Sequence, residues 1–284
     1  MKLPKFDYAA PSSVAEAVAL LGSRSGNAKA LAGGQSLIPI LAFRLAAPEL
    51  LVDLRRISGL DRIEIGPDGV RLGARVRWCD IEAEARLTQA HPLLAEAVTH
   101  IAHYQIRSRG TVGGSLAHAD PAAELPGIAV ACDAEIAITG SKGTRVAKAG
   151  TFFTGPLMTS LASDELITEL RLPPWPAARR WAFLEFARRH GDFALSGVAL
   201  FYDLAGGRMQ NAHVAVIGAA DRPLRLGTVE AALEGKSLDE TVIEQAAAAA
   251  RAEVDPPSDL HAPAEYRRAL TGTLVERALQ RAAG

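Results

Sequence analysis

The chain is poor in cysteine. Only Cys79 and Cys132 occur among its 284 residues, and they form no CxxC motif. An iron–sulfur cluster usually takes four thiolate ligands, so this chain alone cannot hold one. Two isolated cysteines are typical of reduced, partly buried thiols and not of a disulfide framework.

The sequence also lacks an excess of one charge and long apolar runs. Its net charge of −1 argues against general nucleic-acid binding and against attachment to a membrane surface, since both usually need a basic field. No apolar run is long enough to span a bilayer. The opening residues MKLPKFDY lack the apolar core of a signal peptide, so we expect a cytoplasmic protein.

Motifs for metal binding and nucleophilic catalysis are missing too. There is no HExxH, no histidine-rich cluster and no nucleophile elbow. Neither the P-loop pattern GxxxxGK[ST] nor the dinucleotide pattern GxGxxG occurs. We therefore assign no catalytic residue and no metal ligand to this chain.

Two short glycine-rich segments stand out instead. The first reads AGGQSL over residues 32–37, and the second reads GTVGGSLAHADP over residues 110–121. Paired glycines let an anion come close to backbone N–H groups. Two such segments far apart in the sequence predict one long, phosphate-bearing ligand that is bound at both.

The first segment lies between a predicted strand and a predicted helix. Ser36 is in position to cap that helix, which would leave the N–H groups of Gly33, Gly34 and Gln35 free for a pyrophosphate. Taken alone, this glycine pair also fits a plain turn.

The second segment carries more side-chain chemistry. Thr111 and Ser115 offer hydroxyl groups, and the spacing of Asp120 and Glu124 can present two carboxylates to one ligand, for example to ribose hydroxyls. Considered singly, Glu124 also fits a helix cap or a solvent-exposed residue. His118 alone is more typical of a structural histidine than of a ligand.

The patterning predicts three units: a compact α/β unit over residues 1–60, a second over residues 61–175, and a smaller α+β domain over residues 176–284 with its strands first and its helices last. Helices are predicted at residues 14–21, 37–44, 80–86, 92–102, 238–254 and 264–282. Strands are predicted at residues 28–32, 50–54, 63–65, 70–74, 134–138, 166–172, 181–188, 194–203 and 214–217.

Taken together, these residues resemble the FAD-binding medium subunit of molybdenum hydroxylases, a group that includes carbon monoxide dehydrogenase and, as one domain of a longer chain, xanthine dehydrogenase. The likeness spans nearly the whole sequence, and the two glycine segments in this order are its most specific part. Further matching motifs are FDY at 6–8 with Pro11, PELLVDL at 48–54, QIRSRGTVGGS at 105–115, DPAAELP at 120–126, FFTG at 152–155 and RRHGDFA at 188–194.

The resemblance implies an α+β protein with the two-subdomain FAD-binding fold of p-cresol methylhydroxylase-type flavoproteins, followed by a smaller C-terminal α+β domain. It implies a non-covalent FAD extended between the subdomains, with its pyrophosphate at residues 32–37, the flavin beside Ile101, Ala102 and Ile167, and Phe193 covering one ring face. The implied cofactor contacts are Leu31, Ala32, Gly33, Gly34, Gln35, Ser36, Leu37, Ile101, Ala102, Thr111, Gly113, Gly114, Ser115, Ala117, Asp120, Glu124, Ile167 and Phe193.

The resemblance also implies a role in electron transfer. A molybdenum cofactor on a large partner subunit would act on the substrate, [2Fe-2S] clusters on a small partner subunit would pass electrons on, and FAD here would reduce an external acceptor. Three subunits paired into a dimer of heterotrimers are expected. Relatives often carry a lysine in the strand before Arg188, whereas this chain has Glu185 there, which argues against tuning of the flavin by a cation from this strand.

Two alternatives stay open. One is a self-contained flavin oxidase or reductase that acts on its own small substrate, since the fold supports such enzymes. The other is a binding module without a cofactor, against which the intact glycine segments argue.

Overall fold

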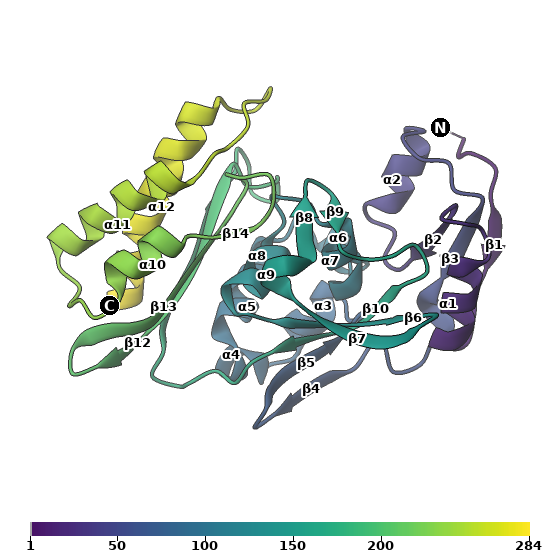
Figure 1. Ribbon diagram of the computed structural model, residues 1–284, viewed down its shortest axis with the longest axis horizontal. Helices are drawn as coiled ribbons and strands as arrows, with labels where there is room; N and C mark the ends of the chain where they lie inside the picture. The colour runs from purple at the N-terminus through teal and green to yellow at the C-terminus, as the bar shows by residue number, and fades with distance from the viewer. Residues whose placement is uncertain (1) are drawn as a thin grey trace.

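Three β-sheets follow one another along the long axis of the molecule, each with helices beside it (Figure 1). The structure is a computed structural model, and it describes residues 2–284. The sheets have three, five and four strands in chain order, and a separate two-stranded hairpin lies next to the central one. The predicted α+β class is confirmed.

The N-terminal sheet is parallel, with the strand order β1-β3-β2. Its elements are β1 (Asp7–Ala9), α1 (Val14–Gly22), β2 (Ala28–Leu31), α2 (Leu37–Ala42), β3 (Leu50–Asp53) and the short 3₁₀ helix η1 (Leu54–Arg56). The predicted cap of the first helix is confirmed, because the Ser13 hydroxyl accepts a hydrogen bond from the Glu16 N–H. Both parallel pairs run through β3, whose four residues are all buried.

The central sheet is antiparallel, with the order β4-β5-β10-β6-β7. Its strands are β4 (Ile63–Gly66), β5 (Gly69–Gly73), β6 (Glu135–Gly140), β7 (Gly143–Lys148) and β10 (Leu166–Leu172). The hairpin pair is β8 (Phe153–Gly155) and β9 (Met158–Thr159). The helices are α3 (Trp78–Ala83), α4 (Leu87–Ala90), α5 (Pro92–His100), α6 (Tyr104–Arg107), α7 (Val112–His118), α8 (Glu124–Ala131) and α9 (Ala149–Phe152).

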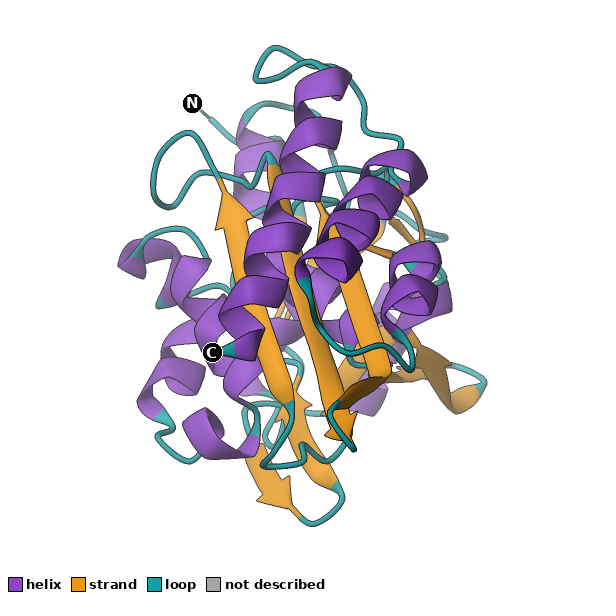
Figure 2. Ribbon diagram, turned by 90° about the vertical axis from the view of Figure 1, so that its left-hand side faces the viewer, coloured by secondary structure: helices purple, strands orange, loops and turns teal. Residues whose placement is uncertain are grey.

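The C-terminal sheet is antiparallel, with the order β11-β12-β13-β14. Its strands are β11 (Arg180–Phe186), β12 (Ser196–Ala205), β13 (Arg208–Ile217) and β14 (Leu224–Arg225), and the helices α10 (Gly227–Leu233), α11 (Glu240–Glu253) and α12 (Ala264–Ala283) follow. Figure 2 shows these helices lying across one face of the strands. The predicted order of strands first and helices last is confirmed.

The opposite face of this C-terminal sheet packs on the central unit. Phe183, Phe201 and Ile217 belong to the same buried cluster as the core of the central helices and strands. A second cluster joins the other face of the sheet to α10, α11 and α12, and a third holds the N-terminal unit together. The domain limits at residues 60 and 175 stay a prediction.

Several elements differ from the sequence-based expectation. The helix expected over residues 92–102 ends at His100, because Ile101 has extended backbone angles and Ala102 lies at φ +42°. Helix α8 was not predicted, because all eight of its residues are buried and no amphipathic period marks it. The second glycine segment, expected to be a loop, is the helix α7.

Arg267 fixes α12 to the ends of β12 and β13, and we expect its loss to destabilise the C-terminal unit. Its side chain is buried, and it donates hydrogen bonds to the carbonyl oxygens of Leu195 (2.8 Å) and Gly218 (2.9 Å) and to Asp259 (2.8 Å). Arg267→Met leaves these acceptors unpaired and should lower the free energy of unfolding by about 3 kcal/mol. Urea unfolding measures the loss. Arg277→Met, on the exposed face of the same helix, should change it by less than about 0.5 kcal/mol, and equal losses would contradict this role.

Candidate functional site

A cleft of about 870 Å³ lies between the N-terminal and central units. This volume is at the upper end of the range of about 300–1,000 Å³ that is usual for small-molecule and cofactor sites. Both glycine segments line it, together with the turn after α5, strand β10, the β8–β9 hairpin and the loop before β12. Segments far apart in the sequence therefore meet around one space.

The cleft brings together nearly all of the residues that the sequence analysis named. Its lining includes Ala32, Gly33, Gly34, Gln35, Ser36, Leu37, Ile101, Ala102, Thr111, Gly113, Gly114, Ser115, Ala117, Asp120, Glu124, Ile167 and Phe193. Leu31, the last residue of β2, is not among the lining residues. The role of each residue as a cofactor contact stays a prediction.

The first glycine segment has backbone donors without partners. Within the described part of the chain, the N–H groups of residues 33–36 donate no hydrogen bond. Gly34 has φ +74°, a conformation that favours glycine, and a Cβ on Gly33 would lie 2.1 Å from the carbonyl oxygen of Arg109. The expectation that Ser36 caps α2 with its side chain is wrong: Ser36 is at the N-cap position in an αR conformation and makes no capping hydrogen bond.

The second glycine segment is built differently. Its amides are already used, because Gly113 N–H donates to the Ala74 carbonyl (2.8 Å) and Gly114 N–H to the Thr111 hydroxyl (3.2 Å). A Cβ on Gly113 would lie 2.6 Å from that of Ala74, so this glycine permits close packing of α7 on the chain after β5. The expectation of free backbone amides at both segments is therefore wrong for the second one.

These features fit a long ligand with one anionic stretch. Lys29 is the one lysine or arginine among the lining residues that the structure describes, so the positive side-chain charge of the cleft is small. An anion would depend on the unpaired N–H groups of residues 33–36, which form a ready donor set. The wall made by α7 and α8 is acidic, with Asp120 and Glu124, and suits uncharged hydroxyl or ring groups better than phosphate.

Glu124 is the most perturbed group of the cleft. It is the first residue of α8 and is 8% exposed, so the interpretation as a solvent-exposed residue is wrong. Burial, and then the negative charge of Glu185, raise the pKa of Glu124 to about 8, with Asp120 adding to the effect. At neutral pH the Glu124 carboxyl therefore carries its proton and can donate a hydrogen bond.

Arg107 shapes the turn beside the cleft, although its position within the QIRSRGTVGGS motif gave it no assigned role. Its Nη1 donates to the carbonyl oxygens of both Ile101 (3.1 Å) and Ala102 (3.0 Å), and its Nε lies 2.9 Å from Glu82. These bonds hold Ala102 in a left-handed conformation that a non-glycine residue rarely adopts. The QIRSRG motif was the available signal, because it places an arginine directly after this turn.

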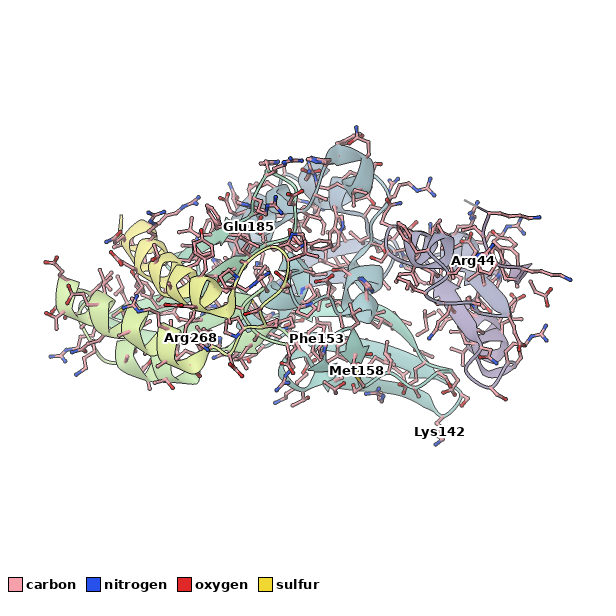
Figure 3. The ribbon with its side chains drawn as sticks, turned by 90° about the horizontal axis from the view of Figure 1, so that it is seen from above. Arg44, Lys142, Phe153, Met158, Glu185 and Arg268 are labelled. Atoms are coloured by element: carbon pink, nitrogen blue, oxygen red, sulfur yellow. The ribbon has the colours of Figure 1, made fainter. Side chains whose placement is uncertain are left out.

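The hairpin β8–β9 also contributes lining residues that sequence reasoning did not name. Leu157, Met158 and Thr159 line the cleft, although Leu157 and Met158 are largely exposed. Figure 3 shows Met158 on the central unit, beside Phe153 of the same hairpin. The FFTG motif marks the start of this hairpin, but no pattern in the sequence shows which residues after it face the cleft.

Over residues 2–284, the structure shows neither a membrane-spanning helix nor a cluster of metal-ligating side chains. Over residues 2–284 no helix is both long and apolar enough to cross a membrane. Across the same range, no three His, Cys, Asp or Glu side chains come together as a set that could hold a metal ion. Both cysteines are free thiols; Cys132 is buried and Cys79 half-buried.

Known protein families match both the N-terminal and the C-terminal part of the chain. Residues 4–175 match the family described as FAD binding domain in molybdopterin dehydrogenase, and residues 181–282 match the CO dehydrogenase flavoprotein C-terminal domain. The chain is 40% identical to the nicotine 6-hydroxylase medium subunit of Paenarthrobacter nicotinovorans, over 98% of each chain. It is 38% identical to the carbon monoxide dehydrogenase medium chain of Hydrogenophaga pseudoflava, over 98% of this chain and 97% of the relative.

Solved structures agree with this assignment. A chain of carbon monoxide dehydrogenase from Hydrogenophaga pseudoflava superposes with a TM-score of 0.97 at 40% identity, covering 100% of this chain and 99% of that one. A chain of quinoline 2-oxidoreductase from Pseudomonas putida 86 gives 0.94 at 36% identity, with coverage of 100% and 99%. The chain belongs to the family of FAD-binding medium subunits of molybdenum hydroxylases, and it is thus an oxidoreductase subunit. The resemblance seen in the sequence is confirmed.

The raised pKa of Glu124 predicts a pH-dependent stability. The folded chain keeps this proton up to about pH 8 and the unfolded chain only to its ordinary value of 4.5, so the stabilisation is complete below 4.5 and is lost as the pH rises to about 8. Glutamine does not titrate. The free energy of unfolding of Glu124→Gln should therefore exceed that of the wild type by a margin that grows across this window. Urea unfolding of the cofactor-free chain at several pH values measures the margin.

The control for this measurement is Glu244→Gln, which removes an exposed carboxylate from α11. Its margin over the wild type should stay constant across the same pH range. A constant or shrinking margin for Glu124→Gln would contradict a buried, protonated Glu124.

Proposed function

We propose that the chain binds FAD non-covalently in the cleft, takes electrons from iron–sulfur clusters of a small partner subunit, and passes them to an external acceptor. A large partner subunit with a molybdenum cofactor would carry the substrate chemistry. The single observation behind this proposal is the cleft itself, which the donor-rich first glycine segment and the acidic wall of α7 and α8 both line. FAD supplies the two-electron redox chemistry, and the protein binds and orients it.

The unpaired backbone N–H groups of residues 33–36 support one orientation of FAD in the cleft. The diphosphate belongs at residues 33–36, where unpaired amides can donate to its oxygens. The flavin belongs toward Ile101, Ala102 and Ile167, which give an apolar lining at the other side. Phe193, which is 67% exposed in the loop before β12, would cover one ring face. The family resemblance implies these assignments, and the placement of donors and apolar groups supports them.

The partners proposed are those that the family resemblance implies. The relatives matched over nearly their full length are named as medium chains or subunits. We propose the same place for this chain, in a complex of large, medium and small subunits paired into a dimer of heterotrimers. A self-contained flavin enzyme is the alternative, and no observation on this chain favours it.

Gly114→Val tests the binding cleft. A Cβ at Gly114 would lie 2.7 Å from the Thr111 hydroxyl, and it points toward Ala32 of the first segment at 3.9 Å. We expect FAD affinity to fall about 10- to 100-fold, because a branched side chain between the two segments obstructs the ligand. Flavin absorbance per chain after gel filtration measures it. Gly66→Val, where a Cβ would meet nothing within 4 Å, is the control and should keep full flavin content.

Phe193→Ala tests the covering of the flavin. This exposed side chain contributes little to the fold, so flavin content should stay near that of the wild type. Loss of a stacking contact should change the rate of reoxidation by the acceptor by about tenfold. Anaerobic reduction followed by stopped-flow reoxidation of the complex measures the rate. An unchanged rate would contradict the stacking role.

Co-expression with the neighbouring open reading frames tests the partners. We expect the chain to co-purify with two other subunits, in a complex whose spectrum contains flavin and iron–sulfur absorption. Light scattering should give twice the mass of the heterotrimer. A flavin-only chain that turns over a small substrate on its own would instead support the alternative.

A further inference from the structure

The turn between α5 and α6 contains two backbone amides without acceptors. Helix α5 ends at His100, and residues 101–103 lead into α6. Across residues 2–284, the N–H groups of Ala102 and His103 donate no hydrogen bond, whereas that of Ile101 donates to the Val98 carbonyl (3.2 Å). Ala102 belongs to the lining of the cleft. Amides that have no partner in the chain are available to a ligand.

Arg107 holds both carbonyl groups of this turn from one side. Its Nη1 donates to the Ile101 oxygen at 3.1 Å and to the Ala102 oxygen at 3.0 Å. Its Nε lies 2.9 Å from Glu82 Oε1, which is an ion-pair distance, although the two groups are not aligned as a hydrogen bond. The Arg107 side chain is only 16% exposed, so the protein around it restricts the guanidinium group to this position.

The direction of the two amides follows from the direction of the carbonyls. Residues 2–284 contain no cis peptide bond, and in a planar trans peptide the C=O and N–H groups point in opposite directions. The Ile101 oxygen and the Ala102 nitrogen share one peptide unit, and the Ala102 oxygen and the His103 nitrogen share the next. Because both oxygens point to Arg107, both N–H groups point away from it. Ala102 lines the cleft and Arg107 does not, so the Ala102 N–H is directed to the side of the cleft.

The loop before β12 approaches this turn with a glycine. A Cβ on Gly191 would lie 3.1 Å from the Ala102 carbonyl carbon and 2.5 Å from His103 Cε1. Gly191 also has φ +85°, a conformation that favours glycine. The same loop carries Phe193, and both Gly191 and Phe193 line the cleft. The turn and the proposed cover of the flavin ring therefore lie at the same end of the cleft.

The backbone of the turn needs support. Ala102 has φ +42°, which is unfavourable for any residue with a Cβ and persists only where the surrounding structure holds it. The two hydrogen bonds from Arg107 are the contacts that hold the peptide units on either side of Ala102. Without them we expect φ to return to negative values, which would rotate these peptide units and turn their N–H groups away from the cleft.

We propose that Arg107 is a positioning residue that directs the backbone N–H of Ala102, with that of His103 beside it, to the carbonyl edge of the flavin ring. The inference rests on the proposed function, since FAD must occupy the cleft. Donors at this edge stabilise the reduced ring, because reduction adds negative charge there. Arg107 is not a lining residue, so it acts on the flavin potential through the turn.

The first experiment needs no cofactor. The chain contains three Ile–Ala pairs, at residues 101–102, 128–129 and 136–137. Labelling isoleucine with ¹³C at the carbonyl and alanine with ¹⁵N therefore gives three correlated NMR signals from the full-length chain purified without FAD. Arg107→Met should move the signal of residues 101–102, because the Ile101 carbonyl loses its donor and the Ala102 backbone relaxes. The other two signals come from α8 and β6 and should stay in place. An unmoved signal of residues 101–102 would overturn the hold of Arg107 on the turn.

The second experiment measures the flavin potential of the complex by equilibrium titration against reference dyes. At equal flavin content, Arg107→Met should weaken binding of reduced relative to oxidised flavin about tenfold, which lowers the two-electron potential by about 30 mV. Adding Ala102→Gly to Arg107→Met should recover most of this loss, because glycine adopts a positive φ without cost. Glycine would not restore a lost ion pair or a lost charge. An unchanged potential in Arg107→Met, or no recovery in the double variant, would overturn the proposal.

Two further variants separate position from charge and from folding. Arg107→Lys keeps the charge but not the planar fork; if Arg107→Met does not fold, it replaces that variant, with a smaller loss of potential that Ala102→Gly should again recover. Arg109→Met removes an exposed arginine two residues away and should change the ratio of affinities by less than about twofold, because water and salt screen that charge. An equal drop in Arg109→Met would overturn the role of the turn. Failure of the proposed function is seen separately, as absence of flavin from the purified complex.

Discussion

The close approach of two backbone segments at Gly33 is the constraint on which the cleft depends. Any side chain at Gly33 would collide with the carbonyl of Arg109, 2.1 Å from where its Cβ would lie. This contact sets the connection between β2 and α2 directly against the residues that lead into α7. It therefore holds the first glycine segment against the central unit beside the cleft.

The two glycine pairs look alike in sequence but have different physical roles. Gly34 at φ +74° shapes a turn whose amides donate no hydrogen bond within the described chain, which suits an anion. The N–H of Gly113 is used by Ala74, and its missing side chain lets α7 pack there. One pair thus exposes backbone donors, while the other permits close packing that positions Thr111, Ser115 and the acidic wall behind them.

The acidic wall links the cofactor cleft to the C-terminal unit. Glu124 belongs to α8, whose Gly127 faces Ile217 of β13, and Glu185 comes from the first strand of that C-terminal sheet. The C-terminal sheet therefore contributes a buried carboxyl group, Glu185, whose charge acts on Glu124. Phe183, Phe201 and Ile217 of the same sheet belong to the central hydrophobic cluster.

Structural features that depend on residues close together in the chain could be predicted from the sequence. The cap of α1 by Ser13 and Glu16, the hairpin of β4 and β5, and the long helices α11 and α12 all follow from short-range patterns. The glycine motifs also led to the family, and the cleft gathers the residues that the family implies. Such features depend on backbone geometry and hydrogen bonds within a few residues.

The sequence by itself determined many of the longer elements, the two glycine segments and the family to which the chain belongs. Only the tertiary structure decided that Gly113 N–H is already paired, that Glu124 is buried, and that the charge of Glu185 acts on Glu124. The reason is that hydrogen-bond occupancy, burial and the charge felt by a carboxyl group depend on residues brought close from distant parts of the chain. No local pattern records which strand of the C-terminal sheet will face α8.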